Sequence, residues 1–253
     1  MHQKEVFFLN KQKEKISGTL HLPNKKTKKA VIVCHGFGAN KNSLWIPKLC
    51  RALAKEGYCA LRFDFAGNGK SEGEFAESNC EKEKQDLNFA IKFMREKKYN
   101  SIATIGHSMG GTVALMNAAN NSREIKAVIA IAAAIHTKKV EDKILTQKEK
   151  KELHEKGQIR LHLGTTHHTL KKSFFHAFEK QKVLKGVQKI KAPILLIHGS
   201  EDHTIPLQES ESAKKEVPRL KLTVIDGGSH TLMRGESANI LIKTAATWLK
   251  ANF

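Results

Sequence analysis

The chain has 253 residues, with 44 Lys or Arg against 25 Asp or Glu, so its formal net charge is +19 at pH 7. A hydrophobic fraction of 40% and a charged fraction of 27% are ordinary for a soluble globular protein. The lysines are dispersed, and no basic run alternates with aromatic residues, which make up only 6% of the chain; these features argue against a nucleic-acid partner and predict a solvated, lysine-rich surface.

Short apolar runs rich in β-branched residues alternate with helical patterns along most of the chain. The apolar runs predict strands at residues 5–9, 16–22, 30–35, 59–65, 101–107, 127–133, 192–199 and 220–226. The patterns between them predict helices at residues 44–56, 81–98, 112–120, 208–216 and 236–249. The first two strands are separated only by a short charged turn, which favours an antiparallel pair. The later alternation predicts a mostly parallel sheet with helices on both faces, an α/β fold.

This alternation is interrupted between Ile135 and Ile190. The interval is rich in lysine and histidine, and within it residues 159–163 (IRLHL) predict a hairpin strand and residues 173–178 (SFFHAF) an amphipathic helix. An insertion of this length in a compact domain is usually a lid, a binding element or disordered. We therefore expect a core made of residues 1–135 and 188–253, with an inserted cap or lid at residues 136–187.

The sequence predicts neither a signal peptide nor a membrane span. The first apolar stretch, residues 6–9, is shorter than a signal-peptide core of about 7–15 residues. The longest apolar run, residues 127–135, is less than half of the roughly 20 residues that cross a bilayer. We expect a cytoplasmic protein without stable membrane insertion. Its four cysteines form no CxxC pair, so no zinc site or redox pair is indicated.

The stretch IGHSMGG (residues 105–111) places Ser108 among three glycines, where a predicted strand gives way to a predicted helix. It fits the Gly-x-Ser-x-Gly pattern of a nucleophile elbow, a tight turn that exposes the serine above the sheet. Glycines at positions 106 and 110 remove side chains that would clash with the adjacent strand and helix. A phosphate-binding loop is the rival interpretation, but FAGNGKSEG (residues 65–73) lacks the first glycine of a Walker loop and the apolar helix after it.

With these features, the chain resembles the α/β-hydrolase superfamily over nearly its whole length, including the order of eight strands, with the predicted cap after the sixth. In that superfamily a serine, an acid and a histidine follow one another along the chain, each on a loop after a strand. The resemblance assigns the acid to Asp202, in HGSEDHTIP (residues 198–206), and the base to His230, in IDGGSHTL (residues 225–232). Ser108, Asp202 and His230 are the predicted catalytic triad.

Neighbouring residues offer alternatives to two members of this triad. Glu201 and Asp226 are alternative acids, although Glu201 adjoins Asp202, so its side chain should point elsewhere. His198 and His203 come before His230 on the acid loop and could at most be neighbours of the acid.

The stabilisation of the reaction intermediate needs two backbone N–H groups aimed at a carbonyl oxygen as it becomes negative. One is expected from Met109, the residue after the nucleophile. The resemblance of HGFGAN (residues 35–40) to the His-Gly-x-Gly loop of esterases and lipases assigns the other to Phe37. The same resemblance places Phe37 and Phe174 in the wall of an acyl or aryl pocket.

The loop HGFGANKN (residues 35–42), the segment DFAGNGKSEG (residues 64–73) and the cap resemble those of small carboxylesterases, among them cinnamoyl and feruloyl esterases and monoacylglycerol lipases. The resemblance implies a serine carboxylesterase that cleaves short-chain acyl or aryl esters through an acyl-serine, without a metal or organic cofactor. A thioesterase, amidase or lipase with the same triad remains an alternative, as does a non-catalytic binding protein on a hydrolase fold. The expected partner is a small-molecule ester, and the expected state is a monomer or homodimer.

Overall fold

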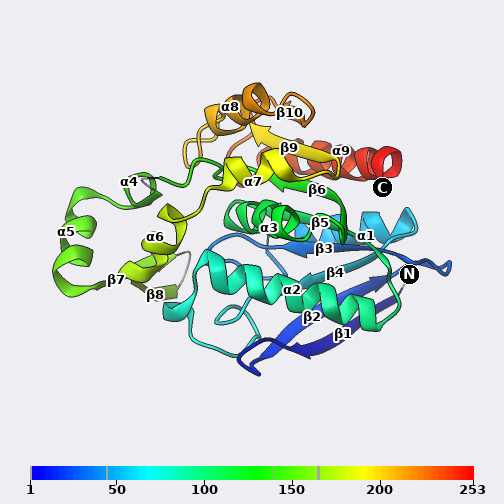
Figure 1. Cartoon of the computed structure of the whole chain (residues 1–253), viewed down its shortest axis with the longest axis horizontal. Helices are drawn as coiled ribbons and strands as arrows, with labels where there is room; N and C mark the ends of the chain where they lie inside the picture. Colours follow the sequence, from blue (N-terminus) through cyan, green and yellow to red (C-terminus); the bar gives the residue numbers. More distant parts are fainter. Residues whose placement is uncertain (1, 44, 139, 164–165) are drawn as a thin grey trace.

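The centre of the molecule is an eight-stranded sheet in the order β1-β2-β4-β3-β5-β6-β9-β10 (Figure 1). The computed structural model describes residues 2–43, 45–138, 140–163 and 166–253. In sheet order the strands are β1 (His2–Leu9), β2 (Lys15–Leu22), β4 (Cys59–Phe63), β3 (Lys29–Cys34), β5 (Ser101–His107), β6 (Ile125–Ile131), β9 (Ile194–Gly199) and β10 (Lys221–Ile225). The β1–β2 and β2–β4 pairs are antiparallel, and the pairs from β4 to β10 are parallel. The predicted eight-stranded, mostly parallel sheet is confirmed.

The central strands are buried on both faces, which explains their continuous apolar sequences. In β3, Ile32 and Cys34 belong to one core cluster, whereas Val31 and Val33 belong to the other. The side-chain alternation of a strand thus fills two separate cores, one above and one below the sheet.

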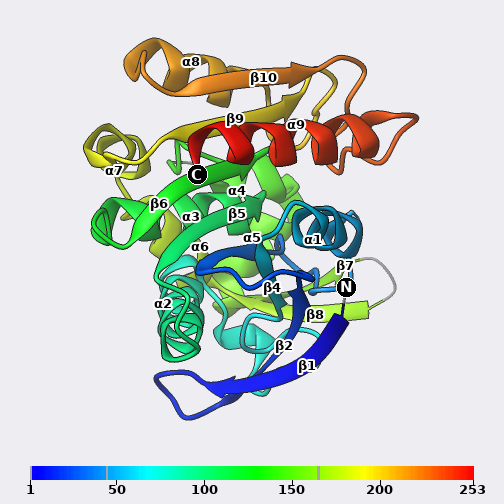
Figure 2. The same cartoon turned by 90° about the vertical axis from the view of Figure 1, so that its right-hand side faces the viewer.

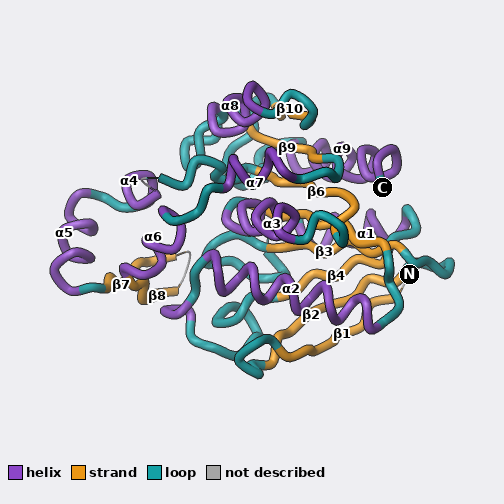
Figure 3. Tube along the Cα trace, viewed as in Figure 1, coloured by secondary structure: helices purple, strands orange, loops and turns teal. Residues whose placement is uncertain are grey.

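Helices cover both faces of the sheet (Figures 2 and 3). The helices of the core are α1 (Ile46–Lys55), α2 (Cys80–Glu96), α3 (Met109–Asn120), α8 (Gln208–Glu216) and α9 (Ser237–Asn252). Buried residues of α1 and α9 fill one core cluster, and those of α2 and α3 fill the other. A proline in its first turn favours the start of α1. The predicted start of this helix, Leu44, lies outside the described residues.

The segment between β6 and β9 has more regular structure than its sequence suggests. Its elements are α4 (Val140–Ile144), α5 (Gln147–Lys156), the β7–β8 hairpin (Gln158–Leu163 and Thr166–Lys171), α6 (Lys172–Glu179) and α7 (Val183–Lys189). Figure 1 shows α4, α5, α6 and the hairpin together at the left of the core. The hairpin strand and the helix that we expected correspond to β7 and α6. The boundaries 136–187 and the role of a cap remain predictions, and residues 139, 164 and 165 lie outside the described residues.

The helix α5 was missed although the sequence carries signals for its two ends. The side chain of Thr146 accepts a hydrogen bond from the Glu149 amide, and the Glu149 carboxylate accepts one from the Thr146 amide, which together form a capping box. Gly157 ends the helix in a left-handed conformation, with φ of 72°. The helix itself is strongly polar, so its apolar periodicity is too weak to reveal it.

The hairpin and the last two helices of the inserted segment contact the core at three places. The β8 strand contacts the short 3-10 helix η1 (Phe75–Glu77), α6 contacts α2, and α7 contacts α3. Within the described ranges, no helix has both the length and the apolar character needed to cross a bilayer.

Candidate active site

Ser108 occupies a strained turn between β5 and α3. Its φ of 51° and ψ of −121° lie in a region that residues with a side chain rarely adopt. A Cβ atom on Gly106 would lie 2.1 Å from the carbonyl oxygen of Gly110, and one on Gly110 would lie 2.2 Å from that of His35. The glycines predicted to permit the elbow therefore have a direct steric reason to be there.

The structure brings Ser108, Asp202 and His230 into one chain of hydrogen bonds. Nε2 of His230 lies 3.0 Å from Oγ of Ser108, and Nδ1 of His230 lies 2.8 Å from Oδ2 of Asp202. The acceptor-only carboxylate requires the proton on Nδ1, so Nε2 is free to accept the serine proton. The three side chains follow β5, β9 and β10, whose carboxyl ends meet at one edge of the sheet.

The alternative acids and His203 lie outside this chain of hydrogen bonds. Glu201 is exposed and pairs with Arg234, whose Nη1 lies 3.7 Å from its carboxylate. Asp226 is also exposed and accepts a hydrogen bond of 3.3 Å from Ser200. His203 is exposed.

The Asp202 carboxylate is buried yet held in its charged form. Burial by itself opposes ionisation, but hydrogen bonds from His198, His230 and the Ile205 amide outweigh it and hold the pKa of Asp202 below its ordinary value. Oδ1 accepts from the amides of Thr204 and Ile205 at 2.9 and 2.8 Å, and Nε2 of His198 lies 3.2 Å from Oδ2. A carboxylate that stays charged can stabilise a histidine that becomes protonated beside it.

The two backbone amides predicted to bind the oxyanion have no hydrogen-bond acceptor among the described residues. Among the described residues, the N–H of Phe37 donates no hydrogen bond, and the N–H of Met109, the first residue of α3, has no acceptor within the helix. The loop that carries Phe37 lies against the nucleophile, because a Cβ atom on Gly36 would be 3.3 Å from Cβ of Ser108. Both amides are therefore available to a ligand near Ser108.

A buried ion pair, which sequence reasoning did not predict, holds this loop. Nζ of Lys41 lies 2.6 Å from Oδ2 of Asp64, and the Lys41 amide donates to Oδ1 of the same carboxylate at 2.6 Å. Their side chains are 2% and 1% exposed, so solvent does little to stabilise the two charges, which depend on each other and on their hydrogen-bond partners. The Lys70 amide also donates to Asp64, and Gly69 lies so close that a Cβ atom there would be 2.5 Å from the carboxylate. Residues 65–73, whose sequence is similar to a phosphate-binding loop, thus pack around the carboxylate of Asp64.

The His35 side chain also connects the loop that carries Phe37 with the loop that follows Asp64. Its Nε2 accepts from the Phe65 amide at 3.1 Å, and its Nδ1 lies 2.8 Å from the Gly36 carbonyl, which fixes the proton on Nδ1. Burial lowers the pKa of His35, so the neutral form that makes both bonds is favoured. The sequence signal was present in the His-Gly-x-Gly pattern, but the role of its histidine was not deduced.

Aromatic side chains gather beside the loop of Phe37. The Phe37 ring centroid lies 4.9 Å from that of Phe174 and 5.3 Å from that of Phe75, which in turn lies 4.2 Å from the His168 ring. The structure therefore brings the two predicted substrate-contacting residues together. Phe75 and His168 belong to the same group of contacting rings. Phe174 is only 1% exposed, so it packs against Phe37 rather than lining an open cavity.

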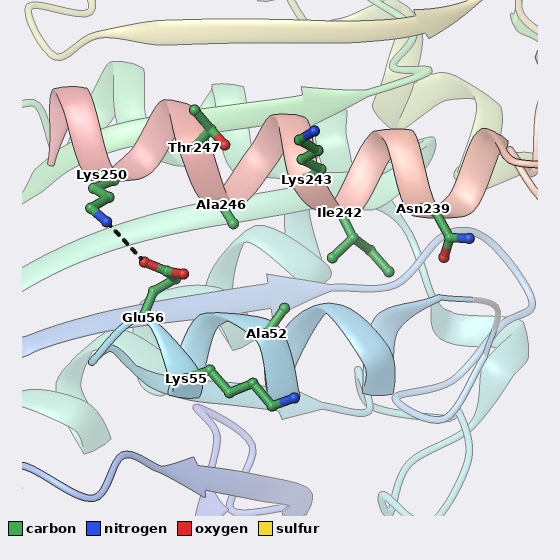
Figure 4. A pocket seen from close by; sticks show the side chains of 9 residues that line it. All are labelled: Ala52, Lys55, Glu56, Asn239, Ile242, Lys243, Ala246, Thr247 and Lys250. Carbon is green, nitrogen blue, oxygen red and sulfur yellow. Dashed lines mark ion pairs between the residues drawn. The ribbon is translucent and has the colours of Figure 1, made fainter.

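A separate hollow of about 450 Å³ lies between α1 and α9 (Figure 4). Glu56 and Lys250 form an ion pair at one end of it, with 3.5 Å between their charged atoms. None of the residues that line this hollow is a predicted site residue. It therefore gives no support for a binding site next to Ser108.

Comparison with known proteins places the chain in a family. The model of the family described as serine aminopeptidase, S33, matches residues 25–184, which include the elbow and the predicted oxyanion loop but neither Asp202 nor His230. The mitochondrial palmitoyl-protein thioesterase ABHD10 of Mus musculus is 24% identical over 222 residues, which are 85% of this chain and 73% of that protein. The putative esterase/lipase 2 of Mycoplasma genitalium is 32% identical over 108 residues, 43% of this chain and 39% of that protein.

A solved structure agrees with the fold. The structure of Est1E from Butyrivibrio proteoclasticus with bound ferulic acid superposes with a TM-score of 0.82 at 21% identity and covers 98% of both chains. At this identity the likeness establishes the α/β-hydrolase fold and leaves the substrate of the present chain open.

Proposed function

The chain belongs to the serine aminopeptidase S33 family of hydrolases, and on the geometry of its site we propose that it is a serine carboxylesterase that cleaves short-chain acyl or aryl esters. The proposal rests on one observation, the continuous hydrogen bonds from Ser108 to His230 and from His230 to Asp202, of 3.0 and 2.8 Å. A decayed member of this set would have favoured a non-catalytic binding protein, but all three side chains are present and in contact.

In the proposed reaction, Ser108 Oγ attacks the ester carbonyl carbon while its proton passes to Nε2 of His230. The amides of Phe37 and Met109 donate to the carbonyl oxygen as it becomes negative. The tetrahedral intermediate then expels the alcohol, which takes the proton from His230 and leaves an acyl-serine. Water, deprotonated by the same histidine, attacks the acyl carbon and releases the acid, and Ser108 regains its proton. Asp202 keeps its charge throughout and stabilises the imidazolium.

The contact between Phe37 and Phe174 supports a preference for substrates with a short acyl group. Phe174 belongs to α6, and the centroid of its buried ring lies 4.9 Å from the ring centroid of Phe37, whose amide we assign to the oxyanion hole. We further propose that residues 136–187 form a cap over the site, with Phe174 at its inner surface. A long acyl chain would have to displace this ring, whereas an acetyl or butyryl group, or a flat aryl group, requires less space.

The test is a panel of p-nitrophenyl esters from acetyl to palmitoyl, together with methyl ferulate, assayed on the wild type and on Ser108→Ala. We expect hydrolysis to be fastest with short acyl chains or the aryl ester and to be lost in Ser108→Ala. A fluorophosphonate probe should label the wild type and not the variant. A wild type that is neither labelled nor active on any ester would overturn the proposal.

Thioester hydrolysis is the second candidate, because relatives that match most of this chain are named palmitoyl-protein thioesterases. The same triad would attack a thioester carbonyl in the same way. Matched pairs of acetyl and palmitoyl esters and thioesters decide between the candidates by their kcat/KM ratios. A preference for palmitoyl thioesters would replace the short-chain ester proposal.

The cytoplasmic location also stays a proposal, since ABHD10 of the mouse is named a mitochondrial protein.

A further inference from the structure

The loop that carries His230 is held by two side chains from distant parts of the chain. Nε2 of His107 lies 2.9 Å from the carbonyl oxygen of His230, and Nε1 of Trp45 donates to the carbonyl oxygen of Thr231 at 3.1 Å. Among the described residues, no backbone N–H donates to either carbonyl. The main chain at the proposed general base therefore has two side-chain donors as its hydrogen-bond partners.

The two donors form one buried unit. The rings of His107 and Trp45 meet edge to face, with centroids 5.8 Å apart and an angle of 88° between their planes. Trp45 is fully buried and His107 is 5% exposed. Burial lowers the pKa of His107 to about 4, so the ring is neutral at pH 7. A carbonyl oxygen only accepts, which fixes the single ring proton of His107 on Nε2.

His107 is also the residue directly before Ser108. Its backbone belongs to β5, one of the central strands of the sheet, and its ring centroid lies 5.1 Å from that of His230. The same residue thus connects the strand that ends at the nucleophile to the loop that carries the proposed base. Any movement of the His230 main chain relative to Ser108 must break or bend this hydrogen bond.

We propose that His107 and Trp45 are positioning residues that clamp the main chain of His230 and Thr231 and so hold the His230 imidazole between Ser108 and Asp202. This inference rests on the proposed function. The Ser108–His230 distance of 3.0 Å has to be maintained for proton transfer. A misplacement of about 1 Å in such a site costs about 10²-fold in rate.

A purely structural role predicts something different. Buried histidine and tryptophan side chains normally find partners for their polar atoms, and removing a partner lowers stability wherever the residue lies. A positioning role additionally predicts that kcat falls while KM changes little. It also predicts a change in the proton between Nδ1 of His230 and Asp202, which should resonate far downfield in the proton NMR spectrum of the wild type: in the variants its signal should be shifted or lost.

The experiment compares His107→Leu, His107→Gln and Trp45→Phe with the wild type. Leucine fills the space without a donor, whereas the glutamine amide can place an N–H where Nε2 of histidine was. Trp248→Phe is the control, because Trp248 is buried in α9 and, within the part of the chain that the structure describes, forms no hydrogen bond with the site residues. Measured quantities are kcat and KM for p-nitrophenyl acetate, the labelling rate with a fluorophosphonate, the downfield proton signal, and the free energy of unfolding.

We expect kcat and labelling rate to fall about 10²-fold in His107→Leu, to fall less in Trp45→Phe, and to recover largely in His107→Gln. The control should lose stability but keep kcat. The inference is overturned if Trp45→Phe and His107→Leu lose stability as the control does yet keep the wild-type kcat and proton signal. An inactive, unlabelled wild type would instead refute the proposed function, and the proton signal would still test the clamp.

Discussion

Replacing Gly106 with alanine tests whether the turn at Ser108 depends on the absence of a side chain. An added Cβ atom would lie 2.1 Å from the carbonyl oxygen and 2.3 Å from the carbonyl carbon of Gly110, whereas real Cβ atoms essentially never approach closer than 3.0 Å. The difference between 3.0 and 2.1 Å means that backbone must move by about 0.9 Å, because both clashing atoms are main-chain atoms. Gly110 is the second residue after the nucleophile, so we expect Ser108 to move as well.

A displacement of this size has two separate consequences. Overpacking in a rigid interior lowers the free energy of unfolding by about 1–3 kcal/mol. A shift of nearly 1 Å at a nucleophile costs about 10²-fold in kcat. Urea denaturation gives the first quantity, and hydrolysis of p-nitrophenyl acetate gives the second.

Gly186→Ala is the matched control. Gly186 lies within α7, and among the described residues outside that helix an added Cβ atom would contact Cβ of Ala119, at 3.1 Å. Because alanine favours a helix interior over glycine by about 1 kcal/mol, this variant should keep its stability within about that amount. If Gly106→Ala matches this control in both stability and kcat, the steric account of the elbow is wrong.

Other predictions follow from the contacts around the site. Asp202→Asn should lower kcat for p-nitrophenyl acetate about 10⁴-fold, because the amide no longer fixes the proton of His230 on Nδ1; a loss below tenfold would contradict the assigned acid. Lys41→Met leaves the Asp64 carboxylate buried without its cation, so the free energy of unfolding in urea should fall by about 3–5 kcal/mol, and adding Asp64→Leu should restore part of it. Burial lowers the pKa of His107 to about 4 in the folded chain. In the unfolded chain this histidine has its ordinary pKa of about 6.5, so as the pH falls the unfolded chain is protonated before the folded chain. The contribution of His107 to stability is therefore complete above pH 6.5 and falls by about 3 kcal/mol as the pH is lowered towards 4. Urea denaturation of His107→Gln between pH 6.5 and pH 4 should show a loss of stability smaller than that of the wild type by this amount. Equal losses in the two proteins would refute the lowered pKa of His107.

The core of the fold was predictable because its signals are local. The runs of β3, β5, β6 and β9 belong to strands that are largely buried on both faces, so apolar residues dominate them. The elbow was equally predictable, since Gly106 and Gly110 answer a steric demand that arises within a few residues of the chain.

The inserted segment was less predictable for a related reason. The polar helix α5 has one fully buried residue, Leu153, so periodicity gives almost no signal. The strand β8, with the sequence THHTLK, owes its position to pairing with β7. Pairing partners, capping residues and packing neighbours decide the structure in this part of the chain.

By itself, the sequence determined the α/β architecture and the turn that exposes Ser108, because both depend on residues close together in the chain. The order of the serine, acid and histidine candidates came from the resemblance to the α/β-hydrolase superfamily. Only the tertiary structure decided that Asp202, rather than Glu201 or Asp226, meets His230, and that the side chains of Lys41, His107 and Trp45 are buried where they hold the loops of the site. These roles depend on contacts between residues separated by 23 to 186 positions. Such contacts form only once the sheet has brought the ends of its strands together, so no local sequence pattern predicts them.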